Sequence, residues 1–222
     1  MDDNYTQKIN IGARILDSAR GNLYLAMRFM DIALCAFAYK PDEGRQMAGT
    51  DGNVIYYCPD YVMDRYEAGR GYADRLYLHM TLHCIYRHIF RISNRKVRLW
   101  NLACDIAVEH VIDGLPYGCV RMRIPAVRDL CYRKISEYTS ILNADLIYKY
   151  LENNPMDEDT LKAWENEFLV DDHTYWYRED KNSRSNMKNE QKWDDISRKM
   201  QTSMETIEKG IGHDDKNLYD SI

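Results

Sequence analysis

Apolar residues recur at helical spacing along most of this chain, and only short stretches follow a strand pattern. The segments with helical spacing, which we predict to be helices, are residues 4–20, 72–91, 99–112, 144–151, 158–168 and 187–209. The β-branched and aromatic run at 53–58 follows a turn signal at 49–52 and predicts a strand, after which Pro59 begins a short helix. These elements predict an α+β fold class with a small sheet.

Charge is distributed unevenly along the chain. Residues 1–150 carry 20 basic and 17 acidic side chains, whereas residues 151–222 carry 10 basic and 18 acidic ones, which together give the net charge of −5. The shift falls near Pro155, in a short polar stretch typical of a boundary. We therefore predict a first domain over 1–152 and an acidic helical extension or connector over 153–222.

Composition argues against several classes of protein. The longest apolar run, Ile32 to Tyr39, has eight residues and cannot span a bilayer, and the first residues form no basic or apolar leader, so we expect a cytoplasmic location. The six cysteines form no Cys-x-x-Cys pair, which excludes a zinc ribbon. The basic stretch at 87–98 is expected to be a solvated loop or a docking surface for the acidic part of the chain. Because the net charge is negative, we expect neither a nucleic acid nor a membrane as a partner.

A histidine pair lies on the helix predicted over 72–91. His79 and His83 are four residues apart, so both imidazoles lie on one face of the helix, where they could bind one Zn²⁺. The spacing matches the zincin motif His-Glu-x-x-His, except that Met80 replaces the glutamate. That glutamate normally takes a proton from zinc-bound water, which a methionine cannot do. The alternative is that both histidines are ordinary residues at the edge of the core.

The helix predicted over 99–112 carries two acids on one face. Asp105 and Glu109 are four residues apart among apolar residues, and a buried carboxylate is costly unless it is paired or bound to a metal. Asp105 is therefore a candidate third ligand, which would complete a site of two imidazoles and one carboxylate with an open fourth position. Glu109 is the candidate catalytic residue, as a base in place of the missing glutamate. Alternatively, both acids face water or pair with the arginines at 87, 91, 95 and 98.

Two further histidines are alternatives to this ligand set. His88 lies five residues after His83, about 140° around the same ideal helix, so packing or a hydrogen bond to a ligand fits it better than metal binding. His173, whose tautomer the adjacent Asp172 could fix, could supply a fourth ligand or a proton shuttle, although a surface loop is the simpler interpretation. The third ligand therefore stays open among Asp105, Glu109, His88 and His173.

Two motifs in order resemble a known family. Their residues are His79, His83, His88 and Arg91, followed by Trp100, Asn101 and Asp105. Together they resemble the bacterial zincin-like metallopeptidase domain that precedes a von Willebrand factor A-like domain, over about residues 10–175. The resemblance implies a zincin-like α+β core with zinc as its cofactor, bound by His79, His83 and Asp105. It also implies that a von Willebrand factor A-like domain follows this chain and that an AAA-type ATPase is a partner.

Two functions are consistent with these residues. The first is a zinc-binding metallopeptidase-like domain that acts as a metal-dependent hydrolase, with water as the nucleophile and Glu109 as the base. The second, which Met80 favours, is a non-catalytic, degenerate metallopeptidase module that binds an AAA-type ATPase, a von Willebrand-like system or a substrate protein. A third interpretation is a helical interaction domain without a metal, in which the histidines are ordinary polar residues.

Overall fold

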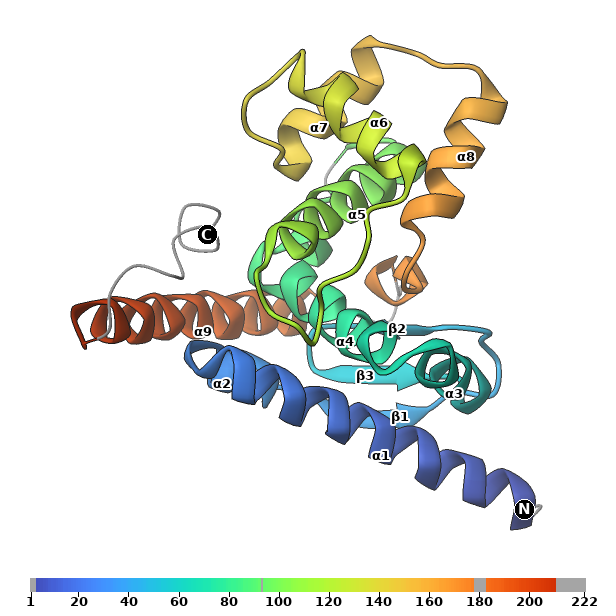
Figure 1. Ribbon diagram of the computed structural model, residues 1–222, viewed down its shortest axis with the longest axis vertical. Helices are drawn as coiled ribbons and strands as arrows, with labels where there is room; N and C mark the ends of the chain where they lie inside the picture. Colours follow the sequence, from blue (N-terminus) through green and yellow to red (C-terminus); the bar gives the residue numbers. More distant parts are fainter. Residues whose placement is uncertain (1–2, 93, 178–182, 211–222) are drawn as a thin grey trace.

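Helices make up most of the protein in the computed structural model, which describes residues 3–92, 94–177 and 183–210 (Figure 1). The α-helices are α1 (Asp3–Ala26), α2 (Asp31–Leu34), α3 (Pro59–Ala68), α4 (Arg70–Ile85), α5 (Val97–Gly114), α6 (Ala126–Ser136), α7 (Ala144–Asn153), α8 (Glu158–Phe168) and α9 (Ser183–Gly210). Short 3₁₀ helices are η1 (Arg28–Met30), η2 (His88–Phe90) and η3 (His173–Tyr177). The mixed α+β class predicted from the sequence is confirmed, with helices dominating.

The strands form one small three-stranded sheet. They are β1 (Ala38–Pro41), β2 (Ala48–Thr50) and β3 (Val54–Tyr57), in the order β1-β3-β2. β3 matches the strand predicted over 53–58 and runs parallel to β1 and antiparallel to β2. Gly49, which the sequence placed in a turn, lies in β2 opposite Tyr56. The turn itself is made by Gly52, whose φ of 90° is readily adopted by glycine alone.

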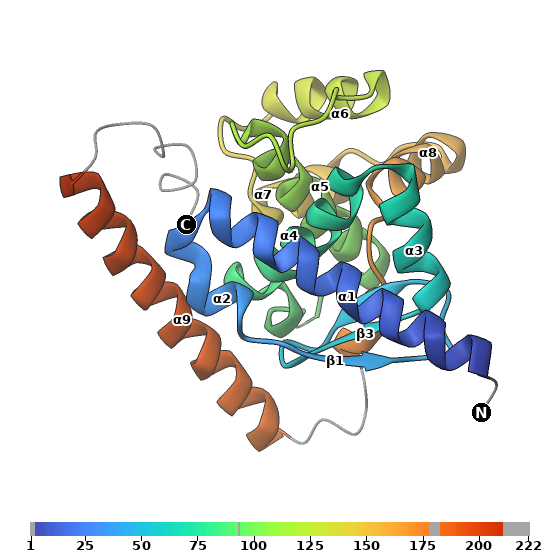
Figure 2. The ribbon, with the colours of Figure 1, turned by 60° about the horizontal axis from the view of Figure 1, so that its bottom comes forward.

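Helix α4 forms the centre of the molecule. It contacts α1, α3, α5 and α9, and every side chain from Ala73 to Ile85 is buried. Figure 1 shows α6, α7 and α8 gathered at one end of the molecule and α1, the sheet and α9 at the other, with α4 and α5 between them. In Figure 2, α1 crosses the sheet and α9 lies beside α2. The residues of α4 are therefore held from several sides at once.

Helix α4 ends earlier than the sequence predicts. The predicted range extended to residue 91, but the α-helix stops at Ile85 and Arg87 adopts the left-handed conformation with φ 62°. This turn redirects the chain into η2, so His88 does not continue around the α4 surface. The placement of His88 about 140° around a continuous helix is therefore wrong, because the chain turns at Arg87.

The acidic part of the chain packs against the rest of the molecule. α8, which has the predicted bounds, contacts α5 and α6, and α9 contacts α2 and α4. Trp193 of α9 is fully buried and donates a hydrogen bond of 2.7 Å to the carbonyl oxygen of Gly52. Ion pairs from Arg98 to Glu158 and from Arg87 to Asp194 join the basic stretch to this acidic part. The two-domain division stays a prediction, and these contacts favour one folding unit.

Among the described residues, no helix combines the length and the apolar character that a membrane crossing requires.

Candidate metal centre

Helix α4 places two imidazoles side by side in the protein interior. His79 and His83 are both fully buried, and their Nε2 atoms lie 2.8 Å apart. The four-residue spacing produces this arrangement because it brings both side chains to one face of the helix. Two nitrogen atoms that point at one spot are the start of a metal site.

Helix α5 adds a carboxylate to the same spot. Oδ1 of Asp105 lies 3.3 Å from Nε2 of His79 and 3.2 Å from Nε2 of His83. Asp105 is buried on α5, most of whose other buried residues are apolar. The structure therefore brings together the three residues for which the sequence analysis proposed metal binding.

The segment after α8 completes the cluster with two more side chains. Nε2 of His173 lies 3.0 Å from Oδ1 of Asp105 and 2.9 Å from Oδ1 of Asp171. All five candidate ligand atoms lie within 4.8 Å of one another, and all five residues are buried. The members of this group, which we call the metal cluster, are His79, His83, Asp105, Asp171 and His173.

Sequence reasoning missed Asp171 and gave His173 only a secondary place. It paired His173 with Asp172, but the Asp172 carboxylate turns away, accepting a hydrogen bond from the backbone N–H of Thr174 and lying 3.8 Å from Arg45. The only local signal was two aspartates and a histidine next to aromatic residues. Their contribution depends on tertiary packing, which periodicity does not reveal.

Backbone contacts with β2 hold this segment in place. The N–H of Asp172 donates to the carbonyl oxygen of Ala48 at 2.7 Å, and a Cβ added to Gly49 would lie 2.2 Å from the carbonyl oxygen of Asp172. Only a residue without a side chain allows this close approach. Gly49 is therefore a requirement of the site rather than of a turn.

Tyrosines fix the two ends of the same segment. The hydroxyl of Tyr61 donates to the carbonyl oxygen of Val170 at 2.6 Å. The ring of Tyr175 stacks on Tyr56 at 4.6 Å, and its hydroxyl donates to Asp42 at 2.8 Å. These contacts anchor the chain just before Asp171 and just after His173, so both side chains are directed into the metal cluster.

Several donor and acceptor atoms of the cluster lack hydrogen bonds. Oδ1 of Asp105, both carboxylate oxygens of Asp171 and Nε2 of His173 are buried, and although some of them lie 2.9–3.0 Å apart, none makes a contact with hydrogen-bond geometry among the described residues. Buried polar atoms of this kind are costly unless something binds them. Three imidazole nitrogens and two carboxylates, with no cysteine, suit a divalent transition metal. The residues present therefore fit a bound metal ion.

The pKa values of the cluster reflect its two carboxylates. Burial alone would lower the pKa of His173, but the charges of Asp105 and Asp171 raise it to about 10. Burial and the neighbouring His79 lower the pKa of His83 to about 4. Against the effect of burial, the imidazoles hold the pKa of Asp171 below its usual value. Ionised carboxylates beside imidazoles provide the negative charge that a cation needs.

Glu109 lies behind the cluster rather than inside it. Its Oε1 is 2.8 Å from Nδ1 of His79, the nitrogen that faces away from the other cluster atoms. Its Oε2 accepts hydrogen bonds from Arg75 and Arg128, and all three side chains are buried. Although burial raises the pKa of a carboxyl group, His79 and the two arginines hold the pKa of Glu109 well below its usual value. Both oxygens are thus engaged in orienting a histidine.

Met80 lies in the hydrophobic core and is fully buried. The position that would carry the zincin glutamate is thus occupied by an apolar side chain among apolar neighbours. Two other side chains contact histidines of the cluster. The ring of Trp176 stacks on His173 at 3.7 Å, and Nδ1 of His88 lies 2.9 Å from Nδ1 of His83. His88 thus supports a cluster histidine through a hydrogen bond.

Comparison with known proteins identifies one family. A family model described as "Putative metallopeptidase domain" matches residues 13–216. No curated protein and no solved structure matches the chain. The match covers both helices of the metal cluster and extends through α9.

Proposed function

Because this chain belongs to the Putative metallopeptidase domain family, we propose that it is a zinc-binding, zincin-like domain whose metal centre holds the fold together. The observation that carries this proposal is the convergence of five buried side chains from α4, α5 and the segment after α8. A metal bound to all three elements would cross-link parts of the chain far apart in sequence. Such closed sites contribute directly to folding stability.

We assign the ligands by the distances among their atoms. Ligand atoms in a tetrahedral zinc site lie about 3.3–3.4 Å apart, given zinc–nitrogen distances of about 2.0–2.1 Å. Oδ1 of Asp105 lies 3.0–3.3 Å from Nε2 of the three cluster histidines. Oδ1 of Asp171 lies 2.9, 3.4 and 3.9 Å from Nε2 of His173, His79 and His83, a wider spread around the tetrahedral value. His79, His83, His173 and Asp105 would therefore hold the ion, with Asp171 beside them.

The non-catalytic interpretation has the stronger support. Four protein ligands close the site, and catalytic zinc sites keep a position open for water. Met80 lies where the glutamate base would be, and Glu109 is bound to His79, Arg75 and Arg128. As a non-catalytic module the chain would bind a partner protein. The inference that this partner is an AAA-type ATPase or a von Willebrand factor A-like domain rests on the resemblance of the motifs alone.

A second candidate function is metal-dependent hydrolysis, favoured by one observation. Asp171 is fully buried in the cluster; its Oδ1 lies 2.9 Å from Nε2 of His173, and its Oδ2 has no hydrogen-bond partner among the described residues. A bound zinc ion would supply Lewis acidity and lower the pKa of a coordinated water. In that reaction Asp171, rather than Glu109, would accept the proton, while Glu109 would keep His79 oriented.

Elemental analysis of the purified protein tests the metal centre. We expect about one zinc per chain, lost in the His79→Ala, His83→Ala double variant and kept in His110→Ala, which removes an exposed histidine outside the cluster. A parent protein without metal, even after zinc is supplied and excess removed, would refute the proposal. Peptide hydrolysis that needs zinc and disappears in Asp171→Asn would move the assignment to the hydrolase.

A further inference from the structure

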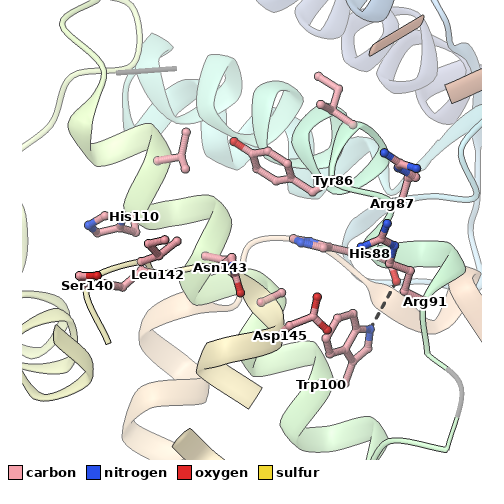
Figure 3. Close-up of a pocket in the computed structure, with 15 residues that line it drawn as sticks. Tyr86, Arg87, His88, Arg91, Trp100, His110, Ser140, Leu142, Asn143 and Asp145 are labelled. Carbon is pink, nitrogen blue, oxygen red and sulfur yellow. Dashed lines mark hydrogen bonds between the residues drawn. The ribbon is translucent and has the colours of Figure 1, made fainter. Parts of the chain in front are cut away.

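A cavity of about 580 Å³ lies directly behind the metal cluster (Figure 3). Its walls come from the end of α4, η2, α5 and the residues that lead into α7. Much of the lining is apolar, including Ile85, Val111 and Leu142. His88 forms the wall on the side of the cluster, since it both lines the cavity and contacts His83.

His88 presents a polar atom to this cavity. The residue is 4% exposed, and of its two ring nitrogens only Nδ1, which contacts Nδ1 of His83, has a hydrogen-bond partner among the described residues. Figure 3 shows its imidazole extending toward the space between Tyr86 and Asn143. Among the described residues no hydrogen bond engages Nε2, the ring nitrogen of His88 that is free to face the open volume.

A metal bound at His83 determines whether Nε2 of His88 is a hydrogen-bond donor or an acceptor. If Nε2 of His83 binds a metal, its proton must be on Nδ1, which then donates to Nδ1 of His88. His88 must in turn carry its own proton on Nε2. With a metal bound at His83, the cavity therefore faces a fixed N–H donor, which calls for a hydrogen-bond acceptor.

Two further features of the lining favour a negatively charged acceptor. Arg91 lines the cavity, and within the described residues its guanidinium has no ion pair, whereas the neighbouring Arg87 and Arg95 pair with Asp194 and Asp145. The first two residues of α7, Ala144 and Asp145, also line the cavity, and the Asp145 carboxylate is paired with Arg95. A helix N-terminus favours a negative charge.

We propose that this cavity binds the carboxylate of a small organic acid or of a peptide C-terminus that carries an apolar side chain. The carboxylate is held by Arg91, the start of α7 and the N–H of His88, and the apolar group lies against Ile85, Val111 and Leu142. The role of His88 rests on the proposed function, because its tautomer depends on the metal at His83.

Metal and carboxylate binding are then coupled. A carboxylate that accepts from Nε2 of His88 makes Nδ1 a better acceptor, which strengthens its hydrogen bond with His83 and makes His83 a better ligand. Linkage requires the effect to be reciprocal, so bound ligand tightens zinc binding and bound zinc tightens ligand binding by the same factor.

Isothermal titration of the zinc-loaded protein with N-acetyl-L-leucine tests the site. We expect binding that N-acetyl-L-leucinamide, which lacks the carboxylate, does not reproduce. Arg91→Gln should weaken it by about tenfold or more, while Arg121→Gln, an exposed arginine outside the cavity, should leave it unchanged. Pentapeptides ending in leucine, with a free or an amidated terminus, distinguish the two sources: a peptide that binds only as the free acid identifies a C-terminus, and binding of the small acid alone identifies a metabolite.

Equal affinity for the acid and the amide, or an Arg91→Gln variant that binds as the parent does, would overturn the proposal. Zinc affinity, measured by chelator competition, should rise with saturating N-acetyl-L-leucine in the parent and not in Arg91→Gln; no rise in the parent refutes the coupling. Failure of the proposed function shows in the zinc content of the protein. It is distinguished from failure of this proposal by repeating the acid, amide and Arg91→Gln comparisons on the protein without added zinc.

Discussion

Oε1 of Glu109 lies 2.8 Å from Nδ1 of His79, on the opposite side of the imidazole from the metal cluster. The Nδ1–H of His79 can donate to this carboxylate, which leaves the lone pair of Nε2 for a metal. Carboxylate–histidine pairs of this kind raise the basicity of the ligand and fix its tautomer. Arg75 and Arg128 fix the carboxylate in turn. The structure thus gives Glu109 a positioning role.

Glu109→Gln should weaken zinc binding by about 10–100-fold, the usual effect of removing such a partner. It should also lower the free energy of unfolding by about 3 kcal/mol, because Arg75 and Arg128 lose part of their compensating charge in a buried site. Chelator competition and denaturant unfolding measure the two effects. Glu137→Gln, at an exposed position, is the control. Unchanged zinc affinity in Glu109→Gln would contradict the positioning role.

Gly49→Ala tests how Asp171 and His173 reach the cluster. The added Cβ would lie 2.2 Å from the carbonyl oxygen of Asp172, so the segment must move away from β2. We expect a loss of about 3 kcal/mol in stability and a large drop in zinc affinity. The matched control is Gly21→Ala, where nothing lies within 4 Å of the new atom.

In that control, stability should rise by about 0.5–1 kcal/mol, because alanine favours the helix interior. If Gly49→Ala bound zinc as tightly as Gly21→Ala, the contact with Asp172 would not matter to the site. Thermal unfolding and chelator competition on both variants decide this.

Asp74 predicts a pH effect outside the metal cluster. Its side chain is 3% exposed and accepts hydrogen bonds only from Asn22 among the described residues; burial raises its pKa to about 6. Since the folded pKa exceeds the unfolded value of 3.8, the stability that this group contributes is present below pH 3.8 and is lost as the pH rises through 6.

Asp74→Asn should therefore be more stable than the parent by about 2 kcal/mol at pH 8 and differ little at pH 4. The exposed Asp64→Asn should show no such pH dependence. Denaturant unfolding across this range measures the difference. A constant difference between Asp74→Asn and the parent at both pH values would refute the raised pKa.

Residues 1–152 produced alone test the predicted domain boundary. This fragment lacks the buried side chains Trp164, Phe168 and Trp193, and it lacks Asp171 and His173 of the metal cluster. We expect it not to fold cooperatively and not to bind zinc, as judged by circular dichroism and metal analysis. A fragment that melts cooperatively would restore the two-domain division.

The sequence predicted those parts of the structure that depend on local patterns. Helical periodicity located α5 and α8, and the four-residue spacing correctly indicated that His79 and His83 share one face of α4. The apolar surroundings of Asp105 singled it out on the same grounds, since a buried acid needs a partner. These inferences need only neighbours within a few turns of one helix.

The rest of the site depends on contacts that no local pattern encodes. Asp171 reaches the cluster because the chain after α8 pairs with β2, far away in sequence. His88 turns back to His83 through the left-handed residue Arg87, a conformation that arginine rarely adopts and that sequence does not predict. The role of Glu109 likewise depends on Arg75 and Arg128, which come from two other helices.

X-ray absorption spectroscopy at the zinc edge tests the central claim most directly. For the zinc-loaded protein we predict a shell of nitrogen and oxygen at about 2.0–2.2 Å, with the scattering of three imidazoles. That scattering should fall to two imidazoles in His173→Gln and stay at three in His110→Gln. A sulfur shell at about 2.3 Å, or a spectrum that His173→Gln leaves unchanged, would contradict a centre built from α4, α5 and the segment after α8.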